Sequence, residues 1–305
     1  MKTLQTKFCN VTFPSPLISV SGIVTSPQAN AVLAKEKGIG AITWKSVSLR
    51  ERKSHPVPVV VPYSSGYINS VGLQNPGLEQ AAKDILHIKK QIRVPLIISI
   101  VAFQISEFYP LALGVAKTRP DFIEINLSCP NVDDEAGKPF GTDLLMTTLA
   151  IQEVKRAAGD IPVIAKLTPN VVDITEFARA AEEAGADAIS AINTSGPGLL
   201  IDVSKRKPKL GHKIGGISGK AIKPLALRCV YEIAKTVNIP IIGIGGVSTG
   251  EDAIEMIMVG ATLVGVGSAI FGVGNSIFPK IAQQMQDIME KHHIRDLKSI
   301  KKCID

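Results

Sequence analysis

A cysteine flanked by two asparagines offers the most informative chemistry in this chain. Cys129 lies between Asn126 and Asn131, directly after an apolar run that ends at Leu127 and is typical of a strand buried on both faces. Two glycines and a proline in residues 133–142 predict an active-site loop insertion that covers this strand end. A thiolate can act as a general base where its surroundings favour the ionised form and exclude water. The alternative is a core cysteine, since free cysteine is among the most buried residue types.

Eight short apolar runs alternate with amphipathic stretches along the chain, as strands and helices do in a parallel α/β fold. The runs are residues 17–20, 41–44, 96–101, 122–127, 163–167, 188–192, 239–244 and 263–266, and helical patterns between them include 78–90, 143–158, 174–184 and 223–237. Eight such units in about 250 residues predict a (β/α)8 TIM barrel. Because no low-complexity linker divides the sequence, residues 1–305 are expected to form one domain. Residues 4–13 favour a short N-terminal β-hairpin that closes the bottom of the barrel.

Active sites of such barrels lie at the carboxyl ends of the strands, so the residues that end these runs should face one mouth. They are Ser21-Gly22, Lys45-Ser46, Ser99, Asn126 with Cys129 and Asn131, Lys166, Asn193-Thr194, Gly245-Gly246 and Gly267-Ser268. Two lysines and several amides at one mouth indicate a site for a polar, anionic, planar ligand.

The last two runs end in glycine-rich turns, 243–246 and 265–268. After strands seven and eight of a barrel such turns are typical phosphate sites, because glycine lets backbone N–H groups approach an oxyanion. Each turn alone could be an ordinary one, but the two together predict a phosphate-bearing cofactor.

The composition is that of a globular protein, with 305 residues of which 45% are hydrophobic and 20% charged. The net charge of +7 is spread along the chain rather than gathered in a block, which argues against a nucleic-acid surface. The four cysteines and five histidines show no metal-ligand spacing, so we expect neither a metal site nor an iron–sulfur cluster in this chain. Widely spaced cysteines and the lack of a long apolar run indicate a cytoplasmic protein without a membrane segment.

Together these motifs resemble those of the class 1 dihydroorotate dehydrogenases, and the resemblance covers nearly the whole chain. Besides the strand ends it rests on the segments Asn69-Ser70-Val71-Gly72-Leu73-Gln74-Asn75-Pro76-Gly77, 165–170, 192–194 and 215–224, which occur in the expected order. The resemblance implies an FMN enzyme that oxidises dihydroorotate to orotate in pyrimidine (UMP) biosynthesis.

Site roles follow from the resemblance, position by position. Cys129 would take a proton from C5 of dihydroorotate while hydride leaves C6 for N5 of FMN, and Lys166 would stabilise the anionic reduced flavin. The implied substrate-binding residues are Lys45, Asn69, Ser70, Val71, Gly72, Leu73, Asn126, Asn131, Asn193 and Thr194. The implied FMN-binding residues are Ser21, Gly22, Lys45, Ser46, Ser99, Asn126, Lys166, Ile192, Gly219, Gly245, Gly246, Gly267 and Ser268.

Within class 1 the motifs are most similar to the NAD-linked class 1B catalytic subunit. Those enzymes pair the FMN subunit with a chain that carries FAD and a [2Fe-2S] cluster, so a homodimer of this chain within a heterotetramer is implied. Class 2 members have an amphipathic N-terminal extension and a serine base, whereas here the first strand is expected near residue 17 and the base position is Cys129. Two features depart from the class 1B pattern: Trp44 precedes Lys45 where a small or β-branched residue is typical, and residues 195–200 are similar to the fumarate-linked group. The electron acceptor therefore stays open between NAD and fumarate.

Two other functions fit parts of the pattern. The tRNA dihydrouridine synthases are FMN barrels with an Asn-x-x-Cys-Pro motif, but they append an RNA-binding domain, and the 37 residues after Ser268 are too few for one. A non-catalytic barrel that binds a phosphorylated metabolite is the alternative from another class, since fold does not fix function. Flavin colour on purification would distinguish that barrel from a flavoenzyme.

Overall fold

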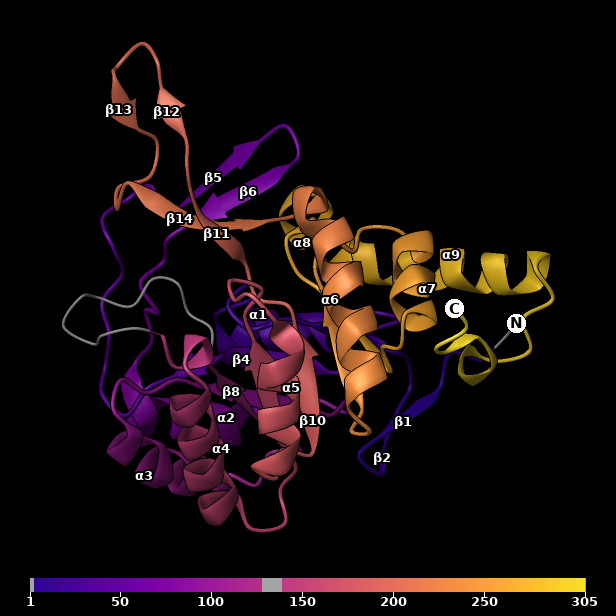
Figure 1. Ribbon diagram of the computed structural model, residues 1–305, viewed down its shortest axis with the longest axis horizontal. Helices are drawn as coiled ribbons and strands as arrows, with labels where there is room; N and C mark the ends of the chain where they lie inside the picture. The colour runs from indigo at the N-terminus through magenta and orange to yellow at the C-terminus, as the bar shows by residue number, and fades with distance from the viewer. Residues whose placement is uncertain (1–2, 128–138, 305) are drawn as a thin grey trace.

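The computed structural model describes residues 3–127 and 139–304, and its centre is a barrel of eight parallel strands (Figure 1). In spatial order the strands are β3 (Leu17–Ser19), β16 (Leu263–Val266), β15 (Ile241–Ile244), β10 (Ala188–Ala191), β9 (Val163–Leu167), β8 (Phe122–Asn126), β7 (Leu96–Ile100) and β4 (Ile42–Val47). A parallel bridge between Ile18 and Ala41, with a hydrogen bond from the Ser19 amide to the Ala41 carbonyl (3.2 Å), joins the two end strands. The predicted (β/α)8 barrel is confirmed.

Helices cover the outside of the barrel (Figure 1). They are α1 (Pro27–Leu33), α2 (Gly77–Lys89), α3 (Ile105–Ala116), α4 (Leu144–Ala158), α5 (Ile174–Glu183), α6 (Lys223–Thr236), α7 (Gly250–Met258), α8 (Ala269–Val273) and α9 (Ile277–Lys291), with 3-10 turns at Phe140–Thr142, Lys220–Ile222, Gly274–Ser276 and Leu297–Ile300. Local sequence sets their starts: Asp143, for example, caps α4 by accepting a hydrogen bond from the Met146 amide (3.0 Å). None of the helices in the described ranges is long and apolar enough to cross a membrane.

The N-terminal hairpin β1 (Thr6–Phe8) and β2 (Val11–Phe13) closes the bottom of the barrel, as predicted. Phe8 and Phe13 are fully buried and pack on Phe122, the first residue of β8, with ring centroids 5.6 and 5.8 Å from its ring. Inward-facing apolar residues at the starts of the barrel strands complete this layer. The open end of the barrel is therefore the opposite one, at the carboxyl ends of the strands.

A second sheet, which we did not predict, is built from two insertions between barrel strands and helices. It contains the antiparallel strands β5 (Val60–Tyr63), β6 (Gly66–Asn69), β14 (Ile214–Ser218) and β11 (Ser195–Leu199), in the order β11-β14-β6-β5, and we call it the mouth sheet. The hairpin β12 (Ile201–Asp202) and β13 (Lys207–Pro208) projects from it (Figure 1). Of the loop predicted at 133–142, residues 133–138 lie outside the described part of the chain.

Candidate active site

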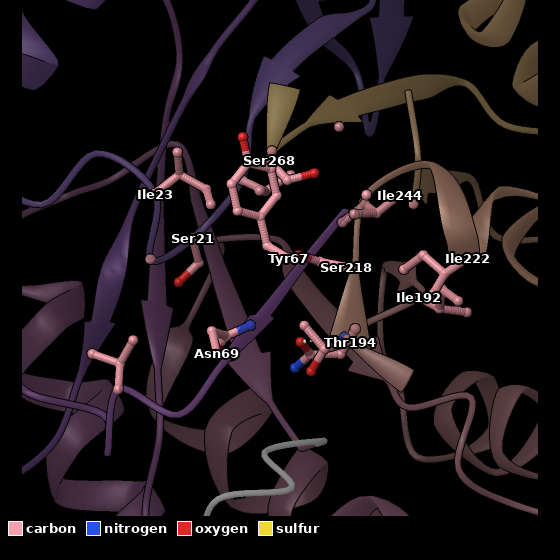
Figure 2. Close-up of a pocket in the computed structure, with 18 of the residues that line it drawn as sticks. Ser21, Ile23, Tyr67, Asn69, Ile192, Thr194, Ser218, Ile222, Ile244 and Ser268 are labelled. Carbon is pink, nitrogen blue, oxygen red and sulfur yellow. Dashed lines mark hydrogen bonds between the residues drawn. The ribbon is translucent and has the colours of Figure 1, made fainter. Parts of the chain in front are cut away.

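A cavity of about 1260 Å³, measured out to open solvent, lies at the carboxyl ends of the barrel strands and extends to the mouth sheet (Figure 2). Its lining combines apolar side chains with amides, lysines and glycine-rich turns, a mixture that is typical of small-molecule and cofactor sites. The predicted site residues that line it are Ser21, Gly22, Lys45, Ser46, Asn69, Val71, Gly72, Leu73, Asn126, Lys166, Ile192, Asn193, Thr194, Gly219, Gly245, Gly246, Gly267 and Ser268.

Two predicted site residues in the described ranges, Ser99 and Ser70, do not line the cavity. Ser99 is fully buried, and its Oγ lies 2.9 Å from the Ser46 Oγ, so it supports a lining residue from behind. Ser70 is also fully buried, and its Oγ lies 2.9 Å from Nδ1 of His55. Cys129 and Asn131 fall outside the residues that the structure describes.

The side-chain amides of the cavity hold one another in place. Asn193 donates from Nδ2 to Oδ1 of Asn126 (3.3 Å), and Asn126 donates from Nδ2 to the Ser46 Oγ (3.3 Å). Across the cavity, Asn69 at the end of β6 donates to the Gly216 carbonyl of β14 (3.2 Å). An amide offers both a donor and an acceptor, so this group suits a ligand whose edge alternates N–H and C=O.

Two lysines bring positive charge to the cavity. Lys166 in β9 is 95% buried, and its Nζ forms an ion pair with Oε1 of Glu124 at 3.6 Å. This Nζ donates no hydrogen bond within the described ranges. Burial lowers the pKa of Lys45, and no carboxylate in the described ranges lies within 4.0 Å of its ammonium. Both ammonium groups thus have capacity to bind an anionic or carbonyl-rich ligand.

The glycine-rich turns after β15 and β16 form what we call the anion cradle, made of Gly245, Gly246, Gly267 and Ser268. Gly246 has a φ of +75°, and a Cβ there would lie 2.6 Å from the Cβ of Lys223. Only glycine fits this turn, which leaves the cradle open to an oxyanion.

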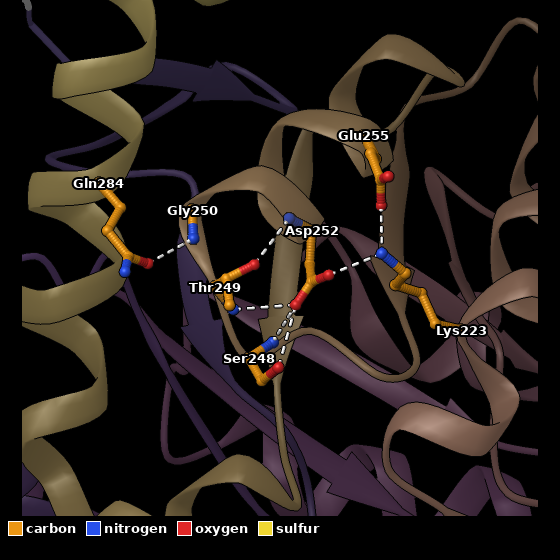
Figure 3. A network of polar contacts seen from close by, with 7 residues as sticks. All are labelled: Lys223, Ser248, Thr249, Gly250, Asp252, Glu255 and Gln284. Carbon is orange, nitrogen blue, oxygen red and sulfur yellow. Dashed lines mark hydrogen bonds and ion pairs between the residues drawn. The ribbon is translucent and has the colours of Figure 1, made fainter. Parts of the chain in front are cut away.

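A network of charges holds the loop behind the cradle (Figure 3). Asp252 accepts hydrogen bonds from the amides of Ser248 and Thr249 (both 2.9 Å) and pairs with the Lys223 Nζ (2.7 Å), which also reaches Oε2 of Glu255 (2.6 Å). Burial alone would raise the pKa of Asp252, but hydrogen bonds from Lys223 and Ser248 outweigh it and bring the pKa below its ordinary value. Burial likewise opposes charge on Lys223, yet its bonds to Asp252 and Glu255 raise its pKa overall.

Sequence reasoning missed two aromatic residues of the cavity wall. Tyr67 of β6 and Phe271 of α8 both line the cavity, with ring centroids 5.3 Å apart, and Figure 2 shows Tyr67 beside Ser268. Tyr67 belongs to the unpredicted mouth sheet, so no strand-end argument could select it. Trp44, the unusual neighbour of Lys45, is buried in the core between barrel and helices and is not a lining residue.

Fold and site together define a class of protein: a (β/α)8 barrel whose mouth combines glycine-rich turns, two lysines and facing amides, and so can bind a polar, anionic ligand. Within that class, the chain belongs to the dihydroorotate dehydrogenase family, whose model matches residues 3–289.

Curated relatives support the same family over nearly full length. The protein of Methanothermobacter thermautotrophicus named dihydroorotate dehydrogenase B (NAD(+)), catalytic subunit, is 40% identical over 286 residues, which are 94% of this chain and 93% of that one. A protein of the same name from Lachnoclostridium phytofermentans is 39% identical, over 96% of this chain and 97% of its own. Another, from Caldicellulosiruptor bescii, is 42% identical over 86% of each chain. The resemblance inferred from the motifs is confirmed.

Proposed function

We propose that this chain is the FMN-bearing catalytic subunit of an NAD-linked dihydroorotate dehydrogenase. Membership of the family makes it an oxidoreductase that converts dihydroorotate to orotate in pyrimidine biosynthesis. The observation that carries the finer proposal is the cavity, which combines an anion cradle with the buried Lys166, the half-buried Lys45 and a group of facing amides.

The residues of the cavity fit FMN. The cradle glycines leave room for a phosphate against backbone N–H groups. At Gly246 a side chain is excluded, because its Cβ would clash with Lys223. The unfilled donors of Lys166 would face the flavin ring and supply positive charge. When bound, FMN would supply the hydride acceptor. Ser21, Ser46 and Asn126 would orient its ring from the strand ends.

The opposite part of the cavity suits dihydroorotate, a cyclic imide that carries a carboxylate. Asn69, Asn193 and Thr194 would hydrogen-bond the imide edge, and Lys45 would attract the carboxylate. Cys129, which follows β8 in the sequence, would remove the proton at C5. Leu73 and Val71 would help to exclude water from the substrate.

Electrons would leave through a second chain. The names of the relatives include the words catalytic subunit, which imply a further subunit in those enzymes. We propose a homodimer of this chain in a heterotetramer whose other subunit carries FAD and a [2Fe-2S] cluster. We place the enzyme in the cytoplasm, which agrees with the free thiols of Cys9, Cys229 and Cys303.

Anaerobic spectroscopy of the purified chain tests this function. We expect the absorbance of bound flavin, and rapid bleaching by dihydroorotate but not by dihydrouracil, which lacks the carboxylate that Lys45 would bind. The isolated chain should then reduce dyes rapidly and NAD slowly, and addition of the FAD and iron–sulfur subunit should restore NAD reduction. A colourless protein would favour the non-catalytic barrel, and efficient fumarate reduction would move the chain to the other soluble group.

A further inference from the structure

The barrel interior directly beneath the cavity contains a buried carboxylate. Side chains alternate along a strand, so Phe122, Glu124 and Asn126 of β8 share the face toward the barrel axis. Phe122 belongs to the apolar bottom layer and Asn126 lines the cavity, so Glu124 lies between them. In the same layer, Lys166 of β9 and Ser190 of β10 are register partners.

Glu124 makes two different contacts with its two oxygens. Oε2 accepts a hydrogen bond from the Ser190 Oγ (3.0 Å). Oε1 has no hydrogen-bond partner among the residues described, and it lies 3.6 Å from the Nζ of Lys166. Because only 3% of the Glu124 side chain is exposed, solvent does little to screen its charge. A buried carboxylate with an oxygen left unbonded is costly for the fold, which points to a role beyond packing.

Lys166 links this carboxylate to the cavity. Lys166 lines the cavity, whereas Glu124 does not. A ligand in the cavity is therefore nearer to the positive charge but also feels the negative one, and in a poorly screened interior the two fields partly cancel. The net charge under the cavity floor depends on Glu124 as much as on Lys166.

We propose that Glu124 is the counter-ion of Lys166 and lowers the reduction potential of a flavin bound in the cavity. This inference rests on the proposed function. Positive charge beside a flavin stabilises its anionic reduced form, so a carboxylate that offsets this charge makes the reduced flavin a better donor. Such a donor suits a weak oxidant like NAD. Glu124 acts through Lys166 and touches neither flavin nor substrate.

The test is the flavin reduction potential, measured anaerobically against a reference dye in the purified holoprotein. Glu124→Gln keeps the side-chain length and an acceptor for Ser190 but removes the charge, so the potential should rise. Lys166→Met should lower it. We expect a shift of about tenfold in the flavin reduction equilibrium for Glu124→Gln, which is about 30 mV for a two-electron couple. The matched control is Glu232→Gln on α6, which removes a carboxylate paired with Arg228 outside the cavity lining and should leave the potential unchanged.

The two variants are expected to shift the flavin potential in opposite directions, and this separates the proposed role of Glu124 from a structural one. If Glu124 only held Lys166 in place, Glu124→Gln would lower the potential as Lys166→Met does, and that result, or an unchanged potential, would overturn the inference. If Glu124→Gln does not fold, the double variant Glu124→Gln/Lys166→Met replaces it, because it leaves no unpaired charge from this ion pair. The flavin potential of this double variant is then compared with that of Lys166→Met. Its potential should be the higher of the two, and equal values would refute the proposal. Wild-type protein without flavin would instead refute the proposed function.

Discussion

Lys223, the first residue of α6, forms an ion pair of 2.7 Å with Asp252, the third residue of α7. The pair lies directly behind the anion cradle, because Gly246 approaches the backbone of Lys223 while Asp252 binds the amides of Ser248 and Thr249. The shape of the cradle thus depends on charges that contact it only from outside.

Loss of this pair should destabilise the protein in a pH-dependent way. Lys223→Met leaves the Asp252 carboxylate, whose side chain is 11% exposed, without its cation, so we expect a loss of about 2 kcal/mol in unfolding free energy near pH 7. The pKa of Asp252 is lowered by folding, so its contribution is present above pH 3.8 and is lost as the pH falls through its folded value. The pKa of Lys223 is raised, so its contribution is present below pH 10.5 and is lost as the pH rises through its folded value.

Urea denaturation of wild type and Lys223→Met across this pH range measures the effect. The difference between the two proteins should be largest between pH 3.8 and 10.5 and should shrink on either side. Arg228→Met is the control, because Arg228 forms an exposed ion pair with Glu232. Loss of that pair should lower the unfolding free energy by less than about 1 kcal/mol. A flat difference across the whole range would contradict the assigned role of the pair.

Gly246→Ala should weaken the binding of FMN far more than that of riboflavin. The new methyl group would lie 2.6 Å from the Cβ of Lys223 and distort the cradle that binds the FMN phosphate. Riboflavin lacks this phosphate, so its affinity should change little. We expect at least a tenfold, or about 1.4 kcal/mol, loss in FMN affinity, measured by flavin fluorescence on titrating the apoprotein. Gly159→Ala is the matched control: Gly159 also has a positive φ, +61°, but no atom lies within 4 Å of its added Cβ. Equal losses for FMN and riboflavin would place the phosphate elsewhere.

Orotate affinity should fall as the pH rises through the pKa of Lys45. Burial lowers that pKa below 10.5, so the positive charge that attracts the carboxylate is lost at a lower pH than for an exposed lysine. Titration of the flavin spectrum with orotate between pH 7 and 10.5 gives the profile. Lys45→Met should bind orotate weakly at every pH, and a variant that kept the wild-type profile would exclude Lys45 as the titrating group.

Cys129→Ser should keep FMN but lose most of its rate of flavin reduction by dihydroorotate near neutral pH. A hydroxyl is a far weaker base than a thiolate, so part of the rate should return at alkaline pH. Stopped-flow flavin absorbance is the measurement, with Cys303→Ser, an exposed cysteine, as the control that should behave as wild type. An unchanged rate in Cys129→Ser at neutral pH would remove Cys129 from the base role.

The sequence predicts the barrel well because its strands are short apolar runs that alternate with helical patterns. The predicted bounds of β9 (Val163–Leu167) and β16 (Leu263–Val266) match the structure, since each is a pure apolar run apart from Lys166. The predicted end of β4 at residue 44 was wrong, because the strand continues to Val47 across a register shift and carries Lys45 and Ser46 within it. A shift of this kind depends on the neighbouring strand and leaves no local signal.

The mouth sheet and the ion pair of Glu124 with Lys166 could not be predicted from the sequence, because they depend on contacts between distant segments. Strand β11 (Ser195–Leu199) contains two glycines and a proline, which locally indicate a loop, and only its pairing with β14 makes it a strand. Glu124 is the one charged residue in the run 122–127, and its partner Lys166 lies on the next strand. Strand-end rules locate residues at the mouth, whereas contacts between insertions and between inner layers require the folded chain.

The mouth sheet also changes which parts of this enzyme can be exchanged in evolution or by design. In most (β/α)8 barrels each loop is fixed to its own strand, so single loops can be recombined independently. Here the insertion after β4 and the one after β10 share a ladder in which Ile68 pairs with Ile217 and Tyr67 with Ser218. A chimaera that receives one insertion without the other would leave a strand edge unpaired above its own active site. The two segments are therefore expected to be inherited, and should be transplanted, as one unit.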